Sequence, residues 1–359
     1  MSECRAAVFN GDGTYALRTF PIPTPGPGGA VLAVEAVGMC GSDVAQLNGH
    51  HHVPGEVAPI VPGHEIVGRI HALAPDADLG VAVGDRVAVE IMVMEAPSAT
   101  NPTGIVAGYS YTLGVGHAHG LWGGYGEYMG LIPGTRLHKL TDDLPAAELT
   151  LFEGLASAVN WVDMVDVRKG DTVVVQGPGH MGLCCIVMAK LRGASRVIVT
   201  GTSHDAARFE IARAVGADEC IDVLEEDVVA KVHALTGGAM ARVVMDMAAV
   251  ATSTVPEAIA LARHGGHILL GGLKNEQPVE IVSDHLIFRS LTIHGGSGST
   301  SASCAEACRL LNEGRIPATE LLGETCTLDD LDHGLALLKR EVPDRDAVRV
   351  VLTHPGERR

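Results

Sequence analysis

Hydrophobic and polar positions follow two different patterns along the 359 residues of the chain. Up to about residue 150, short apolar runs are separated by Gly and Pro, as in Ala30–Val37, Glu65–Leu73 and Asp85–Ile91. Runs of this length that are bounded by turn residues are typical of β-strands. We therefore predict an all-β first half, folded as a partly closed barrel.

The pattern changes near Pro145, where a helix is predicted over Ala146–Val165 and strands then alternate with helices. The predicted strands are Asp171–Gln176, Arg196–Thr200, Arg242–Asp246, His267–Leu270 and Leu291–His294, and the predicted helices are His180–Arg192, Asp205–Val215, Ser253–Arg263, Ser303–Asn312 and Leu328–Lys339. Continuous apolar strands such as Val173–Val175 are expected where helices cover both faces of a parallel sheet. Ala347–Leu352 is predicted to be a closing strand that rejoins the first half.

Composition and charge narrow the classes of function. A formal charge of −17 disfavours nucleic acid and anionic membrane surfaces as partners. Residues 1–5 lack an apolar signal region, and no run of 18 apolar residues occurs. The eight cysteines are scattered without a paired framework, which favours free thiols in a reducing compartment. We expect a cytoplasmic protein of about two domains.

A glycine fingerprint, Gly177-Pro178-Gly179-His180-Met181-Gly182, directly follows the predicted strand Val173–Gln176. In such a sequence the first Gly permits a tight turn, the second lets the backbone approach a pyrophosphate, and the third lets the helix pack on the sheet. The phosphates would lie at the helix N-terminus, where free N–H groups favour anions. We therefore assign Gly177, Gly179, His180, Met181 and Gly182 to a dinucleotide site.

The end of the next strand bears on the choice of cofactor. An acidic residue at this point would hold the ribose hydroxyls of NAD. The chain instead continues as Thr200-Gly201-Thr202-Ser203-His204, and Asp205 comes too late. His204 and Arg208 are the nearby candidates for binding a 2′-phosphate. We expect NAD, with NADP as the alternative, and assign Gly201, Thr202, Ser203 and Arg208 to the cofactor site.

Metal-ligand residue types gather in two short segments, Cys40-Gly41-Ser42-Asp43 and His64-Glu65. Zinc prefers thiolate and imidazole, and a catalytic zinc keeps three protein ligands and one open position. Cys40 and His64 supply two ligands, and Glu153 is the preferred third, with Glu65 as its rival. Each residue also has a structural interpretation: a buried apolar thiol, a hydrogen-bonded imidazole, or an acid in the first turn of a helix.

These segments resemble the zinc-dependent medium-chain alcohol dehydrogenase family. The residues that carry the resemblance are Gly38–Asp43, Pro62–Gly68, Val83–Val87, Gly123–Tyr128 and the glycine fingerprint. The resemblance implies an α/β architecture in which a GroES-like β-barrel catalytic domain over residues 1–155 is followed by a Rossmann domain, a doubly wound parallel sheet, over residues 156–296. Residues 297–359 would return to the catalytic domain. A homodimer or homotetramer is implied as well.

The resemblance also implies roles for single residues. Cys40, His64 and Glu153 fall on zinc-ligand positions, and Ser42 falls on the hydroxyl that passes on the substrate proton. Asp43 would orient the liganding His, and Glu65 would be a carboxylate near the metal that can exchange with a ligand. The implied reaction is hydride transfer between a small alcohol, such as a secondary alcohol or polyol, and NAD(P), which yields a ketone or aldehyde.

The chain departs from the family pattern at three places. No cysteine lies between Cys40 and Cys184, whereas many relatives bind a second, structural zinc there, so we predict one catalytic zinc per subunit and no structural zinc. The His that often ends the proton relay is Ala45, for which His50–His52 or water could substitute. A usual Pro after the third ligand is Gly154.

Two other readings remain open. A zinc-free NAD(P)H-dependent enone or quinone reductase of the same fold would keep the glycine fingerprint without the metal ligands, and a non-catalytic relative would keep only the fold. Four other cysteines are expected to serve packing, namely Cys184, Cys185, Cys304 and Cys308. His117 and His119, near Trp122, could touch the substrate or have a structural role.

Overall fold

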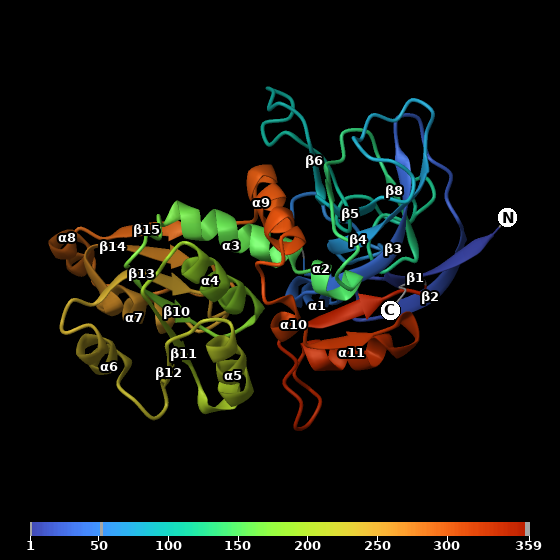
Figure 1. The fold of residues 1–359 in the computed structure, drawn as a ribbon. Coiled ribbons are helices and arrows are strands. Elements are labelled where there is room, and N and C mark those ends of the chain that lie inside the picture. The colour runs from blue at the N-terminus through green and yellow to red at the C-terminus, as the bar shows by residue number, and fades with distance from the viewer. Residues whose placement is uncertain (1, 51–52, 356–359) are drawn as a thin grey trace. The chain divides into compact units, whose positions relative to one another are not determined.

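The computed structural model describes residues 2–50 and 53–355, and it divides into two compact units. Unit 1 comprises Met1–Phe152 and Cys308–Arg359, and unit 2 comprises Glu153–Ala307. The chain therefore begins in unit 1, passes through unit 2 and returns (Figure 1). His51 and His52 lie outside the described residues. None of the described helices has the length and apolar character that a membrane crossing requires.

Unit 1 is built on one large sheet with the strand order β16-β17-β3-β4-β5-β9, and β8 pairs with β3. These strands are β3 (Ala30–Met39), β4 (Glu65–Leu73), β5 (Arg86–Val89), β8 (Tyr128–Leu131), β9 (Leu137–Lys139), β16 (Glu324–Cys326) and β17 (Val350–Thr353). The closing strand β17 pairs antiparallel with β3, as predicted. The described pairings do not join the edges β9 and β16, so the structure shows an open sheet where a partly closed barrel was predicted.

Smaller elements complete unit 1. They are a ribbon of β1 (Glu3–Phe9) and β2 (Tyr15–Pro21), a hairpin of β6 (Met92–Met94) and β7 (Ile105–Gly108), and the helices α1 (Gly41–Leu47), α2 (Ala146–Leu149), α10 (Ala318–Leu321) and α11 (Leu331–Leu338). The core is mostly aliphatic, with Leu32, Ile66 and Val350 fully buried. Tyr125 is also fully buried and packs edge-on against Phe9.

The cysteine-free segment around the β6–β7 hairpin is held by aromatic residues and hydrogen bonds. The hydroxyl of Tyr109 accepts from the backbone N–H of Ile132 at 2.7 Å and lies 2.6 Å from Oγ1 of Thr135. The Tyr109 ring stacks on Trp122, whose Nε1 donates to the carbonyl of His117 at 2.9 Å. These noncovalent contacts stabilise the segment, for which the sequence alone had not identified the stabilising residues.

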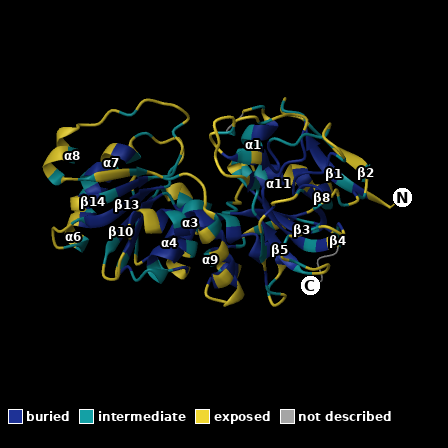
Figure 2. Ribbon diagram, turned by 90° about the horizontal axis from the view of Figure 1, so that it is seen from above, coloured by how far each residue is buried: buried dark blue, intermediate teal, exposed yellow. Residues whose placement is uncertain are grey.

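Unit 2 contains a six-stranded, fully parallel sheet with the order β12-β11-β10-β13-β14-β15. The strands are β10 (Thr172–Gln176), β11 (Arg196–Gly201), β12 (Glu219–Asp222), β13 (Ala241–Asp246), β14 (Ala262–Leu270) and β15 (Thr292–Gly295). The helices are α3 (Phe152–Met164), α4 (His180–Leu191), α5 (Ala206–Ala214), α6 (Val228–Leu235), α7 (Thr254–Leu261) and α8 (Asp284–Arg289), while α9 (Ser301–Asn312) leads back to unit 1. This is the predicted Rossmann arrangement, and its central strands β10, β11 and β13 are largely buried (Figure 2).

Adjacent residues of β10 contribute to the two faces of the sheet. Val174 belongs to a core cluster with Val232 of α6 and Ala258 of α7. Val175 points to the other face, where its Cγ1 lies 3.4 Å from the position that a Cβ on Gly182 would take. Helices therefore cover both faces, which explains why the strand is apolar at consecutive positions.

Two predicted helices differ from the structure. The single helix predicted over Ala146–Val165 is divided into α2 and α3, and the hydroxyl of the buried Thr150 donates to the carbonyl of Ala147 at 2.7 Å at the break. Such side-chain bonds to the backbone compete with helix continuation. The helix predicted over Ser253–Arg263 ends at Leu261, because Ala262 already pairs with Ala241 in the sheet.

Candidate metal and cofactor sites

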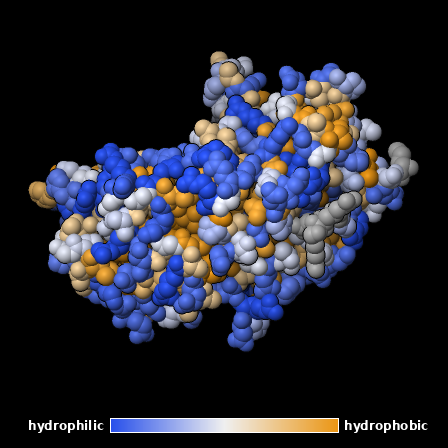
Figure 3. All heavy atoms as spheres, in the orientation of Figure 1, coloured by the Kyte–Doolittle hydropathy of each residue, from blue (hydrophilic) through white to orange (hydrophobic). Residues whose placement is uncertain are grey.

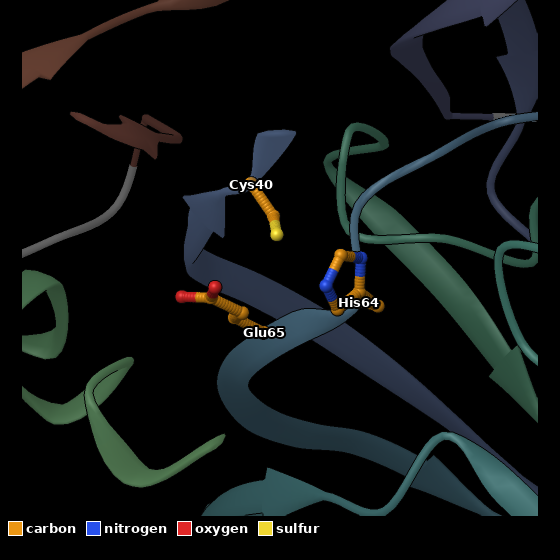
Figure 4. Close-up of side chains that lie close together, drawn as sticks. All are labelled: Cys40, His64 and Glu65. Atoms are coloured by element: carbon orange, nitrogen blue, oxygen red, sulfur yellow. The ribbon is translucent and has the colours of Figure 1, made fainter. Parts of the chain in front are cut away.

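Three of the predicted metal-site residues meet where β3 and β4 pair. Cys40 follows β3 and is the N-cap of α1, His64 immediately precedes β4, and Glu65 begins β4. Gly38 of β3 lies opposite Glu65 in the antiparallel register, which brings the two sequence segments together. One potential ligand atom from each of Cys40, His64 and Glu65 lies within 4.8 Å of the other two, and their side chains converge (Figure 4).

Asp43 orients the imidazole of this cluster. Its Oδ1 lies 3.3 Å from Nδ1 of His64, and its Oδ2 accepts from the N–H of Cys40 at 2.9 Å and from the hydroxyl of Tyr125 at 3.1 Å. Burial disfavours the charged imidazole, but the neighbouring Tyr111, Asp43 and Cys40 outweigh it and raise the pKa of His64 well above its ordinary value. A carboxylate on one ring nitrogen fixes the ring so that the other can bind a metal.

Ser42 provides a hydroxyl beside the cluster. Its Oγ is buried and makes no hydrogen bond of normal geometry to the described part of the chain. The hydroxyl of Tyr111 lies nearby. Burial raises the pKa of Tyr111 to about 12, so this phenol stays protonated at neutral pH. An unsatisfied buried hydroxyl next to a cysteine sulfur, an imidazole and a carboxyl group fits a catalytic zinc site that receives an oxygen-containing substrate.

Glu65 also forms an ion pair. Its Oε2 forms a buried ion pair with Nη2 of Arg349, and the two side chains are only 2% and 1% exposed. A Cβ on Gly38 would collide with both groups, so glycine is required there. Glu153 lies in the first turn of α3, in unit 2. Its role as the third zinc ligand stays a prediction, and Glu65 remains the alternative.

Sequence reasoning missed three side chains at this site. Tyr125 lies in one of the family-like motifs, but its bond to Asp43 has no local signal. Arg349 could have been noticed as a charged residue inside the apolar segment Ala347–Leu352. Tyr111, whose ring centroid lies 5.8 Å from that of His64, has no pattern that would reveal it.

The predicted relay region is only partly described. Ala45 lies in α1 and its carbonyl accepts the N–H of the exposed His50 at 2.9 Å. No described contact places the His50 side chain at the metal cluster. The continuation of the proton path beyond Ser42 therefore stays a prediction.

The glycine fingerprint forms a cradle at the start of α4. Gly177 has a φ of +96°, which favours glycine, and a Cβ on Gly182 would collide with the carbonyl of Gly177. A Cβ on Gly179, the N-cap of α4, would meet nothing closer than Nη1 of Arg208, at 3.8 Å. The turn is thus tight where the helix packs and open at the helix N-terminus, which fits the pyrophosphate of a dinucleotide.

The His180 ring packs closely against Gly154. The His180 ring, in the first turn of α4, packs on the start of α3, and a Cβ on Gly154 would collide with its Nε2. A proline after Glu153 would require the His180 ring to move, so the glycine at this position is compatible with His180 as it lies in the structure. Cys184 and Cys185 are buried in α4, as predicted.

Comparison with known proteins identifies the family of both parts of the chain. Residues 26–142 match the alcohol dehydrogenase GroES-like domain, and residues 181–313 match the zinc-binding dehydrogenase domain. A probable alcohol dehydrogenase of Mycobacterium tuberculosis is 35% identical over 97% of this chain and 98% of its own length. A sorbitol dehydrogenase of Halalkalibacterium halodurans is 30% identical over 96% and 97%.

The fold has a close counterpart among solved structures. The crystal structure of an alcohol dehydrogenase from Thermotoga maritima superimposes with a TM-score of 0.88 at 22% identity, covering 98% of this chain and 100% of that one. With the two-domain match and the full-length relatives, this chain belongs to the zinc-dependent medium-chain alcohol dehydrogenase family.

Proposed function

We propose that the chain is a zinc-dependent dehydrogenase that transfers a hydride between a secondary alcohol or polyol and a nicotinamide dinucleotide, with a ketone or aldehyde as the oxidised product. The observation that carries this proposal is the cluster of Cys40, His64 and Glu65 beside the unsatisfied hydroxyl of Ser42. The glycine cradle of the same chain supports a dinucleotide cofactor. The sorbitol dehydrogenase among the relatives supports the polyol class.

Each residue has a distinct task in this reaction. When bound, zinc supplies Lewis acidity towards the substrate oxygen, and the nicotinamide supplies the hydride chemistry. Cys40 and His64 would hold the single zinc, together with Glu153 or Glu65. Ser42 accepts the alcohol proton and passes it towards solvent, while Asp43 keeps the His64 ring in its liganding orientation.

A direct test combines metal analysis with cofactor reduction. We expect about one zinc per chain, loss of zinc and activity together in Cys40→Ser, and an alcohol-dependent increase in reduced nicotinamide across a panel of secondary alcohols and polyols. A zinc-free protein that reduces enones or quinones would support the reductase alternative. A zinc-loaded protein that reduces no nicotinamide with any alcohol would support a non-catalytic relative.

We also propose a homodimer or homotetramer that pairs through the β15 edge of unit 2. β15 ends the parallel sheet, so one side of this strand carries unpaired backbone groups. Large apolar side chains near it are exposed: Phe288 at 78%, Ile287 at 70% and Ile293 at 37%. Helix α8 is drawn as exposed in Figure 2, and hydrophobic atoms lie at that end of the largely hydrophilic face in Figure 3.

A reducing, cytoplasmic location is part of the same proposal. All eight cysteines are free thiols, and six of them are buried. Thiols of this kind persist in reducing compartments. Localisation of the tagged protein in fractionated cells tests this point.

A further inference from the structure

We infer that the cofactor of the proposed dehydrogenase is the 2′-phosphorylated dinucleotide NADP, and that Arg208 with Thr202 forms its 2′-phosphate site. This inference rests on the proposed function and reverses the expectation of NAD from the sequence. It concerns the end of β11, where the adenosine ribose of a dinucleotide lies in a Rossmann domain.

The strand end carries no acid and has no room for one without rearrangement. β11 ends at Gly201. A Cβ on Gly201 would lie 3.0 Å from Cδ of Pro178 and 3.0 Å from Cζ of Phe209, so this position is closely packed from both sides. The ribose diol of NAD is normally held by an Asp or Glu at this point, and here that acceptor is missing.

The carboxylate of Asp205, the next acid along the chain, forms hydrogen bonds within its own turn. Its Oδ2 accepts from the backbone N–H of Thr202 at 3.0 Å and from the Thr202 hydroxyl at 2.9 Å. These bonds form a capping box around residues 203–205, so they direct the carboxylate back to the chain. Asp205 therefore does not replace the missing acid at the end of β11.

Asp222 is the acid on the neighbouring strand. It lies opposite Gly201 in the parallel register of β11 and β12. Its Oδ1 accepts the backbone N–H of Leu224 at 2.9 Å, which draws this carboxylate into the turn that follows β12. Both acids near the strand end thus have structural tasks.

A cation lies where a phosphate would need it. Arg208, in the first turn of α5, places Nη1 3.8 Å from the position of a Cβ on Gly179, the open glycine at the N-terminus of α4. The pyrophosphate approaches this glycine, so the adenosine ribose lies between it and the end of β11. A guanidinium binds phosphate oxygens in a forked geometry, and the hydroxyls of Thr202 and the exposed Ser203 add donors.

Calorimetric titration of the full chain with adenosine 2′,5′-bisphosphate and with 5′-AMP isolates the 2′-phosphate. We expect the bisphosphate to bind at least about tenfold more tightly. Arg208→Gln should weaken bisphosphate binding roughly 10- to 100-fold and weaken 5′-AMP binding by a clearly smaller factor. Arg213→Gln, on the same helix and ion-paired with Glu210, is the matched control and should change neither.

A charge-reversal variant gives an independent measurement. Thr202→Asp places a carboxylate directly after β11 while keeping a residue suited to capping. We expect it to lower bisphosphate affinity at least about tenfold and to preserve 5′-AMP binding. Equal or tighter binding of 5′-AMP by the unmodified chain would overturn the NADP inference alone. Binding of neither nucleotide nor reduced nicotinamide cofactor would overturn the proposed dehydrogenase function as well.

Discussion

The hydroxyl of Tyr125 donates a hydrogen bond of 3.1 Å to Oδ2 of Asp43, 82 residues away in the chain. The same carboxylate lies against Nδ1 of His64 and accepts the N–H of Cys40. Tyr125 therefore supports two candidate zinc ligands through a single acid. Within the Gly123–Tyr128 motif, Tyr125 is thus the residue that contacts the candidate metal site through Asp43.

Removing this hydroxyl should weaken zinc binding without removing a ligand. We expect Tyr125→Phe to lower zinc affinity about 10-fold or more, because residues behind metal ligands typically contribute 10- to 100-fold. Competition with a chromogenic chelator measures the change. Tyr128→Phe, in the adjacent strand and outside the metal cluster, should retain the original affinity, and an unchanged value for Tyr125→Phe would contradict the assignment.

The ion pair between Arg349 and Glu65 should be important for stability. Arg349→Met leaves Glu65 as a buried charge without its cation, which typically costs about 3–5 kcal/mol. Urea unfolding of the zinc-free protein should show this loss in the free energy of unfolding. The double variant Arg349→Met with Glu65→Gln should recover part of it. If the double variant is as unstable as Arg349→Met, then the two charges are not coupled.

His119 should make the stability of unit 1 depend on pH. Its Nδ1 accepts the N–H of Leu121 at 3.1 Å, and burial, followed by the nearby His117, lowers the pKa of His119 from 6.5 to about 4. The unfolded chain therefore binds more protons between these values, and stability falls as the pH drops from about 6.5 towards 4. The partly exposed ring limits this contribution to roughly 1 kcal/mol.

Thermal unfolding from pH 4.5 to 7.5 checks the contribution of His119. His119→Asn keeps an acceptor for Leu121 but cannot titrate, so its stability should depend less on pH than that of the unmodified protein. His71→Asn changes an exposed histidine of the same unit and should leave the pH profile unchanged. Identical profiles for His119→Asn and the unmodified protein would contradict the prediction.

The exposed apolar residues beside β15 should mediate assembly. Phe288→Asp places a charge in this surface, so we expect the dimer or tetramer to dissociate at micromolar concentration, as judged by light scattering after size-exclusion chromatography. Leu224→Asp is a suitable control, because Leu224 is 61% exposed and lies in the turn after β12, at the opposite edge of the sheet. If the oligomer persists in Phe288→Asp but dissociates in Leu224→Asp, the interface lies at the β12 edge and not at the β15 edge.

Local patterns were sufficient for much of this protein. Val173–Val175 indicated a strand buried on both faces, and Cys40 with His64 indicated the metal cluster, since each depends on nearby residues. β12 was not predicted, because Glu219–Asp222 is short and mixes acidic with apolar residues.

Long-range contacts account for what the patterns could not reveal. Arg349 reaches Glu65 only because β17 returns to β3, across 284 residues of sequence. The third zinc ligand depends on tertiary structure in the same way, so spacing alone left Glu65 and Glu153 as rivals.

The placement of β17 has a consequence for biosynthesis. This strand lies beside β3 in the interior of the unit 1 sheet, yet the ribosome produces it after every other strand that the structure describes. The residues of unit 2 leave the exit tunnel earlier as one continuous stretch, so that unit can fold during translation. The ion pair that holds Glu65 can form only after Arg349 has emerged from the exit tunnel, later in synthesis than the residues of unit 2.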